Sequence, residues 1–272
     1  MNMTSGASNI AIGCKAMGNG VTTGNRNIAL GKLAGCSITS ANNNIILGWY
    51  AGRETTIGKT NIFGGYSAAK CNTSGCYNVI FGLSAGQCGT AGNRRIFIGQ
   101  GAGFKSCGNS NTSIGFYAGC QVTTGSENIA VGSNSMRCAA VTGSNNIALG
   151  SNSSKCMTTG CSNIAIGSGA LQFNTTGGGN TAIGLGALNS NTTAYYNSAL
   201  GFRALWKNTT GAFNTAFGAN ALRDNTTGQY NVAIGAYAMD ESTTSDYCTV
   251  VGYEAAGAGT MTGAYNTLIG VQ

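Results

Sequence analysis

The sequence contains no proline and no histidine, and only 8% of its 272 residues are charged. The absence of histidine removes the commonest general base and the commonest metal ligand. Seven acidic residues remain, of which only Asp240 and Glu241 are adjacent, so nothing indicates a two-carboxylate catalytic site. We therefore predict a protein that is not an enzyme and that holds no metal ion and no cofactor.

Long apolar runs and basic clusters are also missing. No stretch of 18 apolar residues exists, so no segment is predicted to insert into a membrane. The only adjacent basic pair is Arg94-Arg95, which argues against nucleic-acid binding. Residues 1–18 lack the charged and then apolar pattern of a signal peptide. This predicts release by lysis or within a particle, or a natural chain that begins further upstream.

The net charge of +7 is unevenly distributed along the chain. Residues 1–139 hold ten basic and two acidic residues, whereas residues 140–272 hold four basic and five acidic residues. A basic half favours contact with an anionic surface such as a cell envelope. The alternative interpretation is that the charge only keeps the protein soluble.

A short repeat organises the sequence, and with 42% hydrophobic residues and 45 glycines the chain is not a disordered one. Asn-Ile-Ala-Ile-Gly at residues 9–13 returns fifteen times, and eleven of the fifteen spacings are 17 residues. We number each copy from its first residue, position 0. The sixteen residues at position 0 are Asn9, Asn27, Asn44, Asn61, Asn78, Arg95, Asn111, Asn128, Asn146, Asn163, Asn180, Asn197, Asn214, Asn231, Cys248 and Asn266.

Each copy predicts one coil of a solenoid. A unit of about 17 residues is too short for two helices, and it suits two short strands joined by two turns. Position +4 is glycine in all sixteen copies, which indicates a positive φ angle or a close backbone approach. Asparagine at position 0 is expected at a bend, where its amide forms a ladder from coil to coil.

The strand that starts each copy is expected to be buried on both faces. Positions +1 and +3 share one face and position +2 lies on the other, and positions +2 and +3 are each apolar in fifteen of sixteen copies. One face fills the coil, so the other must pack against another chain. Position +2 is alanine nine times, and these small residues predict a symmetry axis of an oligomer along the +2 face.

The repeats resemble those of a known family. Asn180-Thr181-Ala182-Ile183-Gly184, followed by Ala187-Leu188 and Asn191-Thr192-Thr193, is similar to the repeats of virus tail-fibre proteins, phage-like ones in particular. It is also similar to the head repeats of trimeric autotransporter adhesins. The resemblance extends from Asn9 to Gly270 and implies a left-handed parallel β-roll that associates as a homotrimer.

The predicted fold is therefore all-β, a parallel β-solenoid of about sixteen 17-residue coils in a left-handed β-roll. Residues 1–272 are predicted to form a single repeat solenoid. Because residues 271–272 end in mid-coil, we expect a fragment of a longer fibre or subunits that join end to end.

Eleven cysteines occupy recurring positions. Cys71 and Cys76 flank one turn, and Cys156 and Cys161 flank the equivalent turn five coils later. Each pair predicts a disulfide within its coil if the protein matures in an oxidising compartment. Bridges between equal positions of adjacent coils, or a row of reduced thiols, are the alternatives.

Aromatic residues gather at positions +5 and +6, and five of them are candidates for stacking on sugar rings. They are Trp49, Tyr50, Tyr66, Phe116 and Tyr117. Packing at the corner of the coil is the competing interpretation.

These features favour a structural and adhesive fibre protein of a virus particle, which contributes a rigid shaft and contacts a host-surface glycan or protein. The alternative is a secreted or cell-surface adhesin or an extracellular filament subunit, and the third hypothesis is an ice-binding solenoid. The first places the protein in the virion, and the second places it outside the cell or at its surface.

Overall fold

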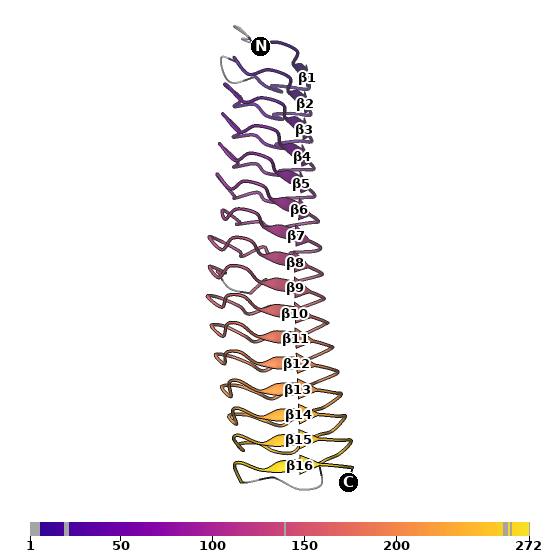
Figure 1. The fold of residues 1–272 in the computed structure, drawn as a ribbon. Coiled ribbons are helices and arrows are strands. Elements are labelled where there is room, and N and C mark those ends of the chain that lie inside the picture. Colours follow the sequence, from indigo (N-terminus) through magenta and orange to yellow (C-terminus); the bar gives the residue numbers. More distant parts are fainter. Residues whose placement is uncertain (1–5, 19–21, 139, 258–260, 262, 272) are drawn as a thin grey trace. The chain divides into compact units, whose positions relative to one another are not determined.

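The computed structural model describes residues 6–18, 22–138, 140–257, 261 and 263–271, which form two compact units, Met1–Ser133 (unit 1) and Asn134–Gln272 (unit 2). Each unit is a stack of similar coils with one three-residue strand per coil (Figure 1). The strands of unit 1 are β1 (Ile10–Ile12), β2 (Ile28–Leu30), β3 (Ile45–Leu47), β4 (Ile62–Gly64), β5 (Val79–Phe81), β6 (Ile96–Ile98), β7 (Thr112–Ile114) and β8 (Ile129–Val131).

Unit 2 repeats this architecture. Its strands are β9 (Ile147–Leu149), β10 (Ile164–Ile166), β11 (Thr181–Ile183), β12 (Ser198–Leu200), β13 (Thr215–Phe217), β14 (Val232–Ile234), β15 (Thr249–Val251) and β16 (Thr267–Ile269). Within each unit every strand pairs in parallel with the next one along the chain, and equal repeat positions face each other, as in Ala182 beside Ala199. No helix occurs among the described residues, and the predicted all-β parallel solenoid is confirmed.

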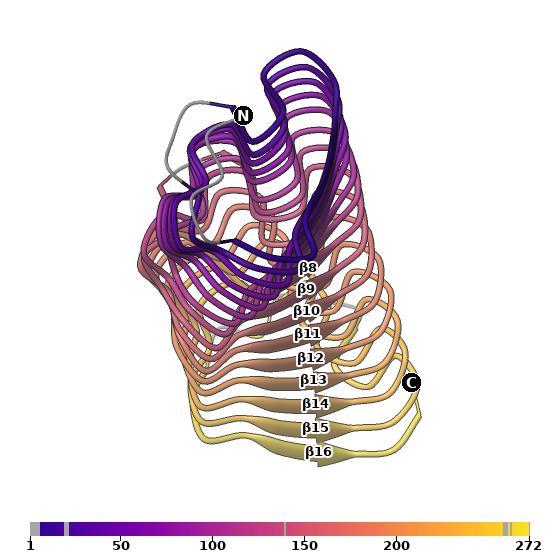
Figure 2. The same cartoon turned by 90° about the horizontal axis from the view of Figure 1, so that it is seen from above.

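The expectation of two strands per coil is wrong. The half of the coil opposite the strand is a series of turns rather than a second strand (Figure 2). These turns are nevertheless tied to the next coil by backbone hydrogen bonds, such as Gly52 N to Ala68 O at 2.9 Å and Glu54 N to Lys70 O at 2.9 Å. The stack therefore satisfies its backbone groups on all sides of the coil without needing extended geometry everywhere.

Positive φ angles bend the chain at four positions of every coil. The glycine at position +4 has φ between 120° and 147° in all sixteen coils, a region that residues with a Cβ rarely adopt. Positions −1, +6 and +8 are left-handed, with φ between 45° and 68°. Most of these residues are not glycine, so each carries a backbone cost of about 1–2 kcal/mol that the stacking of coils must offset.

The asparagines at position 0 form the predicted ladder. Asn61 is buried, and both its backbone N and its Nδ2 donate to Oδ1 of Asn44 at 3.0 Å. Its Nδ2 also donates to Gly75 O, across the coil, at 2.8 Å. Each amide therefore bridges two coils and closes its own coil, and this network satisfies a polar group that would be costly to bury alone.

The predicted assignment of the two strand faces is also wrong. Position +2 does not line an external axis, because Ala182, Ala199 and Ala216 are at most 1% exposed within a single chain. They belong to the hydrophobic core of unit 2. Positions +1 and +3 point outward instead, and their apolar side chains remain half-exposed or exposed.

In most coils one large residue fills the space beside position +2, and the two units supply it differently. In unit 1 the strand itself supplies it, through Ile46, Phe63, Ile80 and Phe97, whereas position +8 is often glycine. In unit 2 position +2 is mostly alanine, and a leucine or methionine at position +8 supplies the volume. These buried residues are Leu171, Leu188, Leu205, Leu222 and Met239.

The glycines at position +8 of unit 1 are required by this packing. A Cβ at Gly103 would lie 2.6 Å from the ring of Phe97, and one at Gly52 would lie 2.9 Å from the ring of Phe63. Such distances are well inside van der Waals contact, so the phenylalanines at position +2, in the same coil for Gly103 and in the next coil for Gly52, leave no room for a side chain at these two glycines.

Arg95 interrupts the asparagine ladder in unit 1. Its guanidinium is fully buried and donates to Asn78 Oδ1, Asn72 Oδ1 and Ser106 O at 2.6–3.1 Å. Burial lowers the pKa of Arg95 to about 10, so the group is charged at neutral pH. Gly89 makes room, since a Cβ there would lie 2.6 Å from Arg95 Nη1.

Candidate functional site

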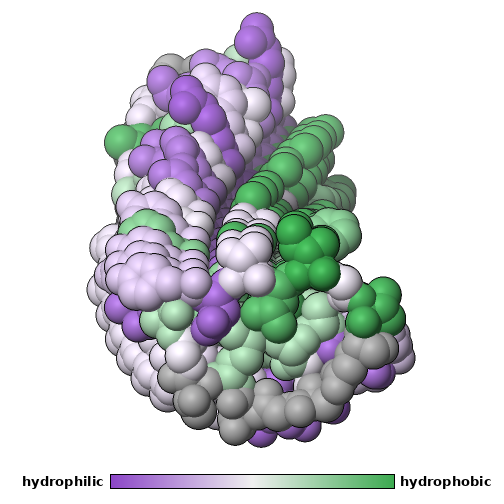
Figure 3. Space-filling view, turned by 60° about the horizontal axis from the view of Figure 1, so that its bottom comes forward, coloured by the Kyte–Doolittle hydropathy of each residue, from purple (hydrophilic) through white to green (hydrophobic). Residues whose placement is uncertain are grey.

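The outward face of the strands carries apolar side chains in both units. Position +3 is apolar in fifteen of sixteen coils, and Phe217 is 53% exposed there. Position +1 adds Ile10, Ile45, Ile96 and Ile129 in unit 1. Because equal positions stack directly, the side chains form hydrophobic rows that run from coil to coil (Figure 3). We call positions +1 and +3 of the strands the outer face.

Trp49, Tyr50 and Tyr66 form one aromatic cluster, as their shared repeat positions suggested. The Trp49 ring stacks on Tyr50 at a centroid distance of 5.3 Å and meets Tyr66 edge-on at 5.5 Å. Trp49 and Tyr66 are exposed. The sequence alone predicted these rings as sugar-stacking candidates, and the structure brings all three together on unit 1.

Three cations surround these rings. Lys32 Nζ lies 5.1 Å from the centre of the Trp49 ring, and Arg53 and Lys70 lie 5.6 and 5.8 Å from the centre of Tyr50. Distances below about 6 Å give a favourable cation–π interaction. The cluster therefore combines apolar ring surface with positive charge, a combination suited to a saccharide that carries carboxylate, sulfate or phosphate groups.

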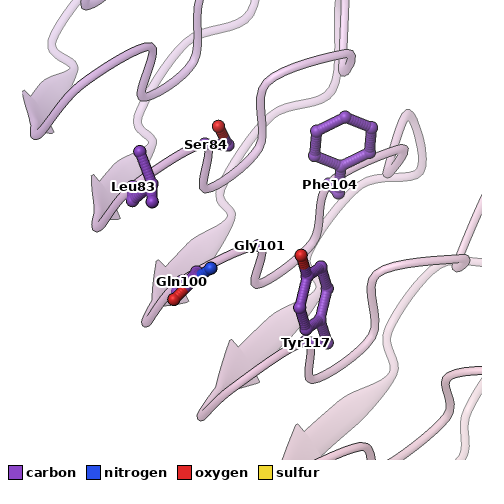
Figure 4. A pocket seen from close by; sticks show the side chains of 6 residues that line it. All are labelled: Leu83, Ser84, Gln100, Gly101, Phe104 and Tyr117. Atoms are coloured by element: carbon purple, nitrogen blue, oxygen red, sulfur yellow. The ribbon is translucent and has the colours of Figure 1, made fainter.

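Phe116 and Tyr117 form a second aromatic pair on unit 1, with ring centres 4.6 Å apart and planes at 82°. Tyr117 also lines a small pocket of about 190 Å³ (Figure 4). The pocket lies at Gly101, which occupies position +6. Most other coils carry a side chain at this position, and its absence here leaves space. The Tyr117 ring leans over that glycine, so that a Cβ at Gly101 would meet the ring at 2.6 Å.

The pocket has apolar walls and a few polar groups. Phe104 and Tyr117 lie on one side of Gly101 and Leu83 lies on the other, while Ser84 and Gln100 supply a hydroxyl and an amide (Figure 4). Its volume is below the range of about 300–1,000 Å³ that is common for small-ligand sites. A single sugar ring or a short side chain of a partner fits this space, and it holds no group that would act as a nucleophile beside a base.

None of the cysteines forms a disulfide in the structure, and the sulfurs of the predicted pairs have other neighbours. Cys76 Sγ accepts from Lys59 N at 3.3 Å, and Cys161 Sγ accepts from Ser144 N at 3.4 Å. The titratable neighbours of Cys71 include Glu54 and Cys88, and Cys88 belongs to the adjacent coil. The arrangement favours pairing between coils over the predicted Cys71–Cys76 bridge.

The second predicted bridge shows the same preference. Cys156 is hydrogen-bonded to Cys138, which occupies the equivalent position one coil earlier. Burial raises the pKa of Cys156, and the nearby Cys138 raises it further. The Cys156 thiol therefore stays protonated at neutral pH and lies beside Cys138.

The sequence reasoning missed an aromatic row in unit 2, at position −1. Its five rings stack face to face, with centre distances of 4.8–5.3 Å, and they belong to Tyr196, Phe213, Tyr230, Tyr247 and Tyr265. The signal was present, since five consecutive copies carry an aromatic residue directly before position 0. We call these five residues the aromatic row.

Two of the seven acidic residues are held by basic side chains. Asp224 is bound by Lys207 at 3.1 Å and by Arg223 at 3.0 Å, and Arg223 also reaches Asp240 at 3.4 Å. Within the described part of the chain, no group of three or more Cys, Asp or Glu residues is placed to hold a metal ion. The described residues likewise include no helix long and apolar enough to cross a membrane.

No protein-family profile matches the chain, and no curated protein is significantly similar to it in sequence.

Proposed function

We propose that this chain is a structural and adhesive fibre protein of a virus particle, a homotrimeric left-handed β-roll that forms a rigid shaft and contacts a glycan or protein on a host surface. In this proposal the protein is not an enzyme and needs no cofactor. It binds no nucleic acid and does not enter a membrane. Its place is the virion.

The outer face is the observation that carries the proposal. A soluble monomer rarely exposes a continuous apolar patch larger than a few hundred Å². Here apolar side chains at position +3 recur in fifteen of sixteen coils, including Phe81, Ile98, Leu200, Phe217 and Ile234, all at least 38% exposed. A surface that repeats with the coil matches a partner that repeats with the same spacing, which is a second copy of this chain.

Association by rotation would cover such a surface. Copies related by rotation about an axis along the stack bring equal rows together in every coil, and a closed ring leaves no apolar row uncovered. The resemblance to tail-fibre and adhesin-head repeats selects three copies. Apolar burial at about 25 cal/mol per Å² makes a long interface of this kind strongly stabilising.

The adhesive part of the proposal rests on the Trp49–Tyr50–Tyr66 cluster with its three cations. Sugar rings stack on exposed aromatic rings, and the cations attract acidic groups, so we expect contact with an anionic glycan. The excess of basic residues within 1–139 also favours contact with an anionic glycan.

Light scattering on the purified protein tests the assembly. The expected molar mass is about 82 kDa, three times the 27.3 kDa of one chain. A folded, stable monomer at micromolar concentration contradicts the proposal. For adhesion, we expect binding to glycans that carry sialic acid or uronic acid, weakened by salt and by Trp49→Ala. Glycan binding that is unchanged in Trp49→Ala contradicts the assignment of this cluster.

A further inference from the structure

The aromatic row of unit 2 ends at a glycine. Rings occupy position −1 in five consecutive coils, from Tyr265 back to Tyr196, and the next coil carries Gly179 at that position. The coil before it carries Ser162. Since coils repeat about every 4.8 Å, two successive places in the row lack a ring.

A hollow of about 400 Å³ lies at this gap. It is bordered by Gly179, Ser162, Tyr195 and Tyr196, and its volume falls within the range of about 300–1,000 Å³ that is typical of small-ligand sites. Tyr196 is 61% exposed, against 42–46% for Phe213, Tyr230 and Tyr247 in the interior of the row. The missing neighbour therefore leaves ring surface of Tyr196 uncovered.

The chemistry of the lining is aromatic and hydroxylic. Tyr195 forms a second wall, with its ring centre 6.2 Å from that of Tyr196 and its plane tilted by 42°. Thr159, Thr176 and Ser162 add hydroxyl groups. No lining residue carries a formal charge, in contrast to the cation-rich cluster of unit 1.

We propose that this hollow is a binding site for a neutral saccharide. The apolar C–H face of a pyranose ring stacks on Tyr196 in the place that the missing rings would occupy. The sugar hydroxyls exchange hydrogen bonds with Thr159, Ser162 and Thr176. The site lies within unit 2 and does not depend on the proposed fibre assembly.

The backbone around the gap permits a variant that fills it. Gly179 has φ of +68°, close to the +56° of Tyr196, so tyrosine at 179 would follow the same left-handed geometry as the rest of the row. A Cβ at Gly179 would lie 2.7 Å from the Tyr196 ring, which must therefore rotate, as a side chain at the surface is free to do. Gly179→Tyr extends the aromatic row and closes the hollow.

Cys161 provides a local probe of occupancy. This exposed cysteine lines the hollow, whereas Cys138 is exposed and does not line it. A bound sugar should slow the alkylation of Cys161 by iodoacetamide and leave that of Cys138 unchanged. At a saccharide concentration about ten times Kd the rate should fall about tenfold, since only the free protein reacts.

The experiment uses neutral oligosaccharides of glucose, galactose or N-acetylglucosamine, with a sialylated trisaccharide for comparison, and peptide mapping of the alkylated protein. We expect at least one neutral oligosaccharide to protect Cys161 in the wild type. Protection should disappear in Gly179→Tyr and in Tyr196→Ala, and should persist in Tyr230→Ala, which alters the same row away from the hollow.

Three results would overturn the proposal. They are no protection by any neutral oligosaccharide, protection that survives in both Gly179→Tyr and Tyr196→Ala, and protection by the sialylated sugar alone. Light scattering on both variants separates this site from the assembly. If both variants lose the wild-type molar mass, the hollow is a contact between subunits and the saccharide proposal is wrong.

Discussion

The coils of unit 1 and unit 2 follow one backbone path but fill its interior from opposite directions. In unit 1 a large residue on the strand, such as Phe97, faces a glycine at position +8, here Gly103. In unit 2 the strand carries alanine, such as Ala182, and the turn supplies Leu188. Both arrangements leave the side chains fully buried.

The difference shows that the coil constrains the total volume of its interior rather than the residue at either position. Protein interiors are packed about as densely as organic crystals, so two large residues would overfill the space. The left-handed φ at position +8 is the same whether glycine or leucine occupies it, 58° at Gly103 and 49° at Leu188. Steric exclusion by Phe97, and not backbone conformation, therefore accounts for the glycine at 103.

The largest expected effect comes from converting a coil of unit 1 to the pattern of unit 2. Phe97→Ala should lower the free energy of unfolding by about 3–5 kcal/mol, because it leaves a cavity in the core. Gly103→Leu alone should cost about 1–3 kcal/mol through overpacking. The double variant should recover at least half of the loss caused by Phe97→Ala, as judged from urea denaturation midpoints. Losses that simply add in the double variant would contradict the shared interior space.

A second conversion concerns the buried cation of unit 1. Arg95→Asn restores the residue found at position 0 elsewhere but leaves Asn72 Oδ1 and Ser106 O without their donor, and we expect a loss of about 1–3 kcal/mol. Adding Gly89→Asn supplies the amide that coils of unit 2 carry at that place, as at Asn191.

The double variant Arg95→Asn/Gly89→Asn should recover only part of that loss, because it removes a desolvated charge but places a Cβ against the backbone oxygen of Ser106. Thermal denaturation of the three proteins at neutral pH decides this. A double variant that is less stable than Arg95→Asn alone would show that the guanidinium, and not the space that Gly89 leaves, is what this coil requires.

Cysteines at equal positions of adjacent coils are neighbours in both units, and mild oxidation of the folded protein should join them. We expect Cys71 joined to Cys88 and Cys138 joined to Cys156, each closing a loop of about 17 residues and contributing about 3 kcal/mol. Peptide mapping without reduction identifies the bridges. Cys71 joined to Cys76, or Cys156 joined to Cys161, would instead confirm the pairing within a coil that the sequence predicted.

The smallest expected effect is electrostatic and confined to unit 2. Burial raises the pKa of Asp224, but hydrogen bonds from Arg223 and Lys207 outweigh it and hold the pKa below its usual value. Its contribution to stability is therefore present above the ordinary pKa of 3.8 and is lost as the pH falls through the lower folded value. Asp224→Asn should lower Tm slightly at pH 7. The loss in the free energy of unfolding should be less than about 1 kcal/mol, because ion pairs near the surface contribute little. The difference in Tm between the variant and the wild type should disappear as the pH falls through the folded pKa of Asp224.

The period, the glycine at position +4 and the asparagine ladder were predictable from the sequence because each is set by the backbone of a single coil. The faces of the strand were not, since positions +2 and +3 are both apolar and alternation does not say which is inside. Alanine at position +2 suggested a close external approach. Leu188 and its equivalents fill the space beside that alanine from the turn, which the strand pattern alone could not show.

The candidate site was predictable only in part. The aromatic residues at positions +5 and +6 include Trp49, Tyr50 and Tyr66, which the structure brings together because equal positions stack in a solenoid. Their contact with sugars stays a prediction. The pocket beside Tyr117 and the hollow beside Tyr196 depend on which neighbour in a row lacks a side chain, Gly101 in one and Gly179 in the other. In the sequence, a glycine in such a row cannot be distinguished from the many other glycines of the turns.

Two neighbouring residues of β13 test the assignment of the outer face and the proposed assembly together. Ala216 is 1% exposed and lies in the core, whereas Phe217 is 53% exposed on the outer face. Light scattering and circular dichroism on Phe217→Asp should show a folded protein that has lost the trimer mass, because the charge would have to be buried between subunits. Ala216→Asp should not fold, since it places a charge inside the coil. A Phe217→Asp protein that retains the wild-type mass would contradict association through the outer face.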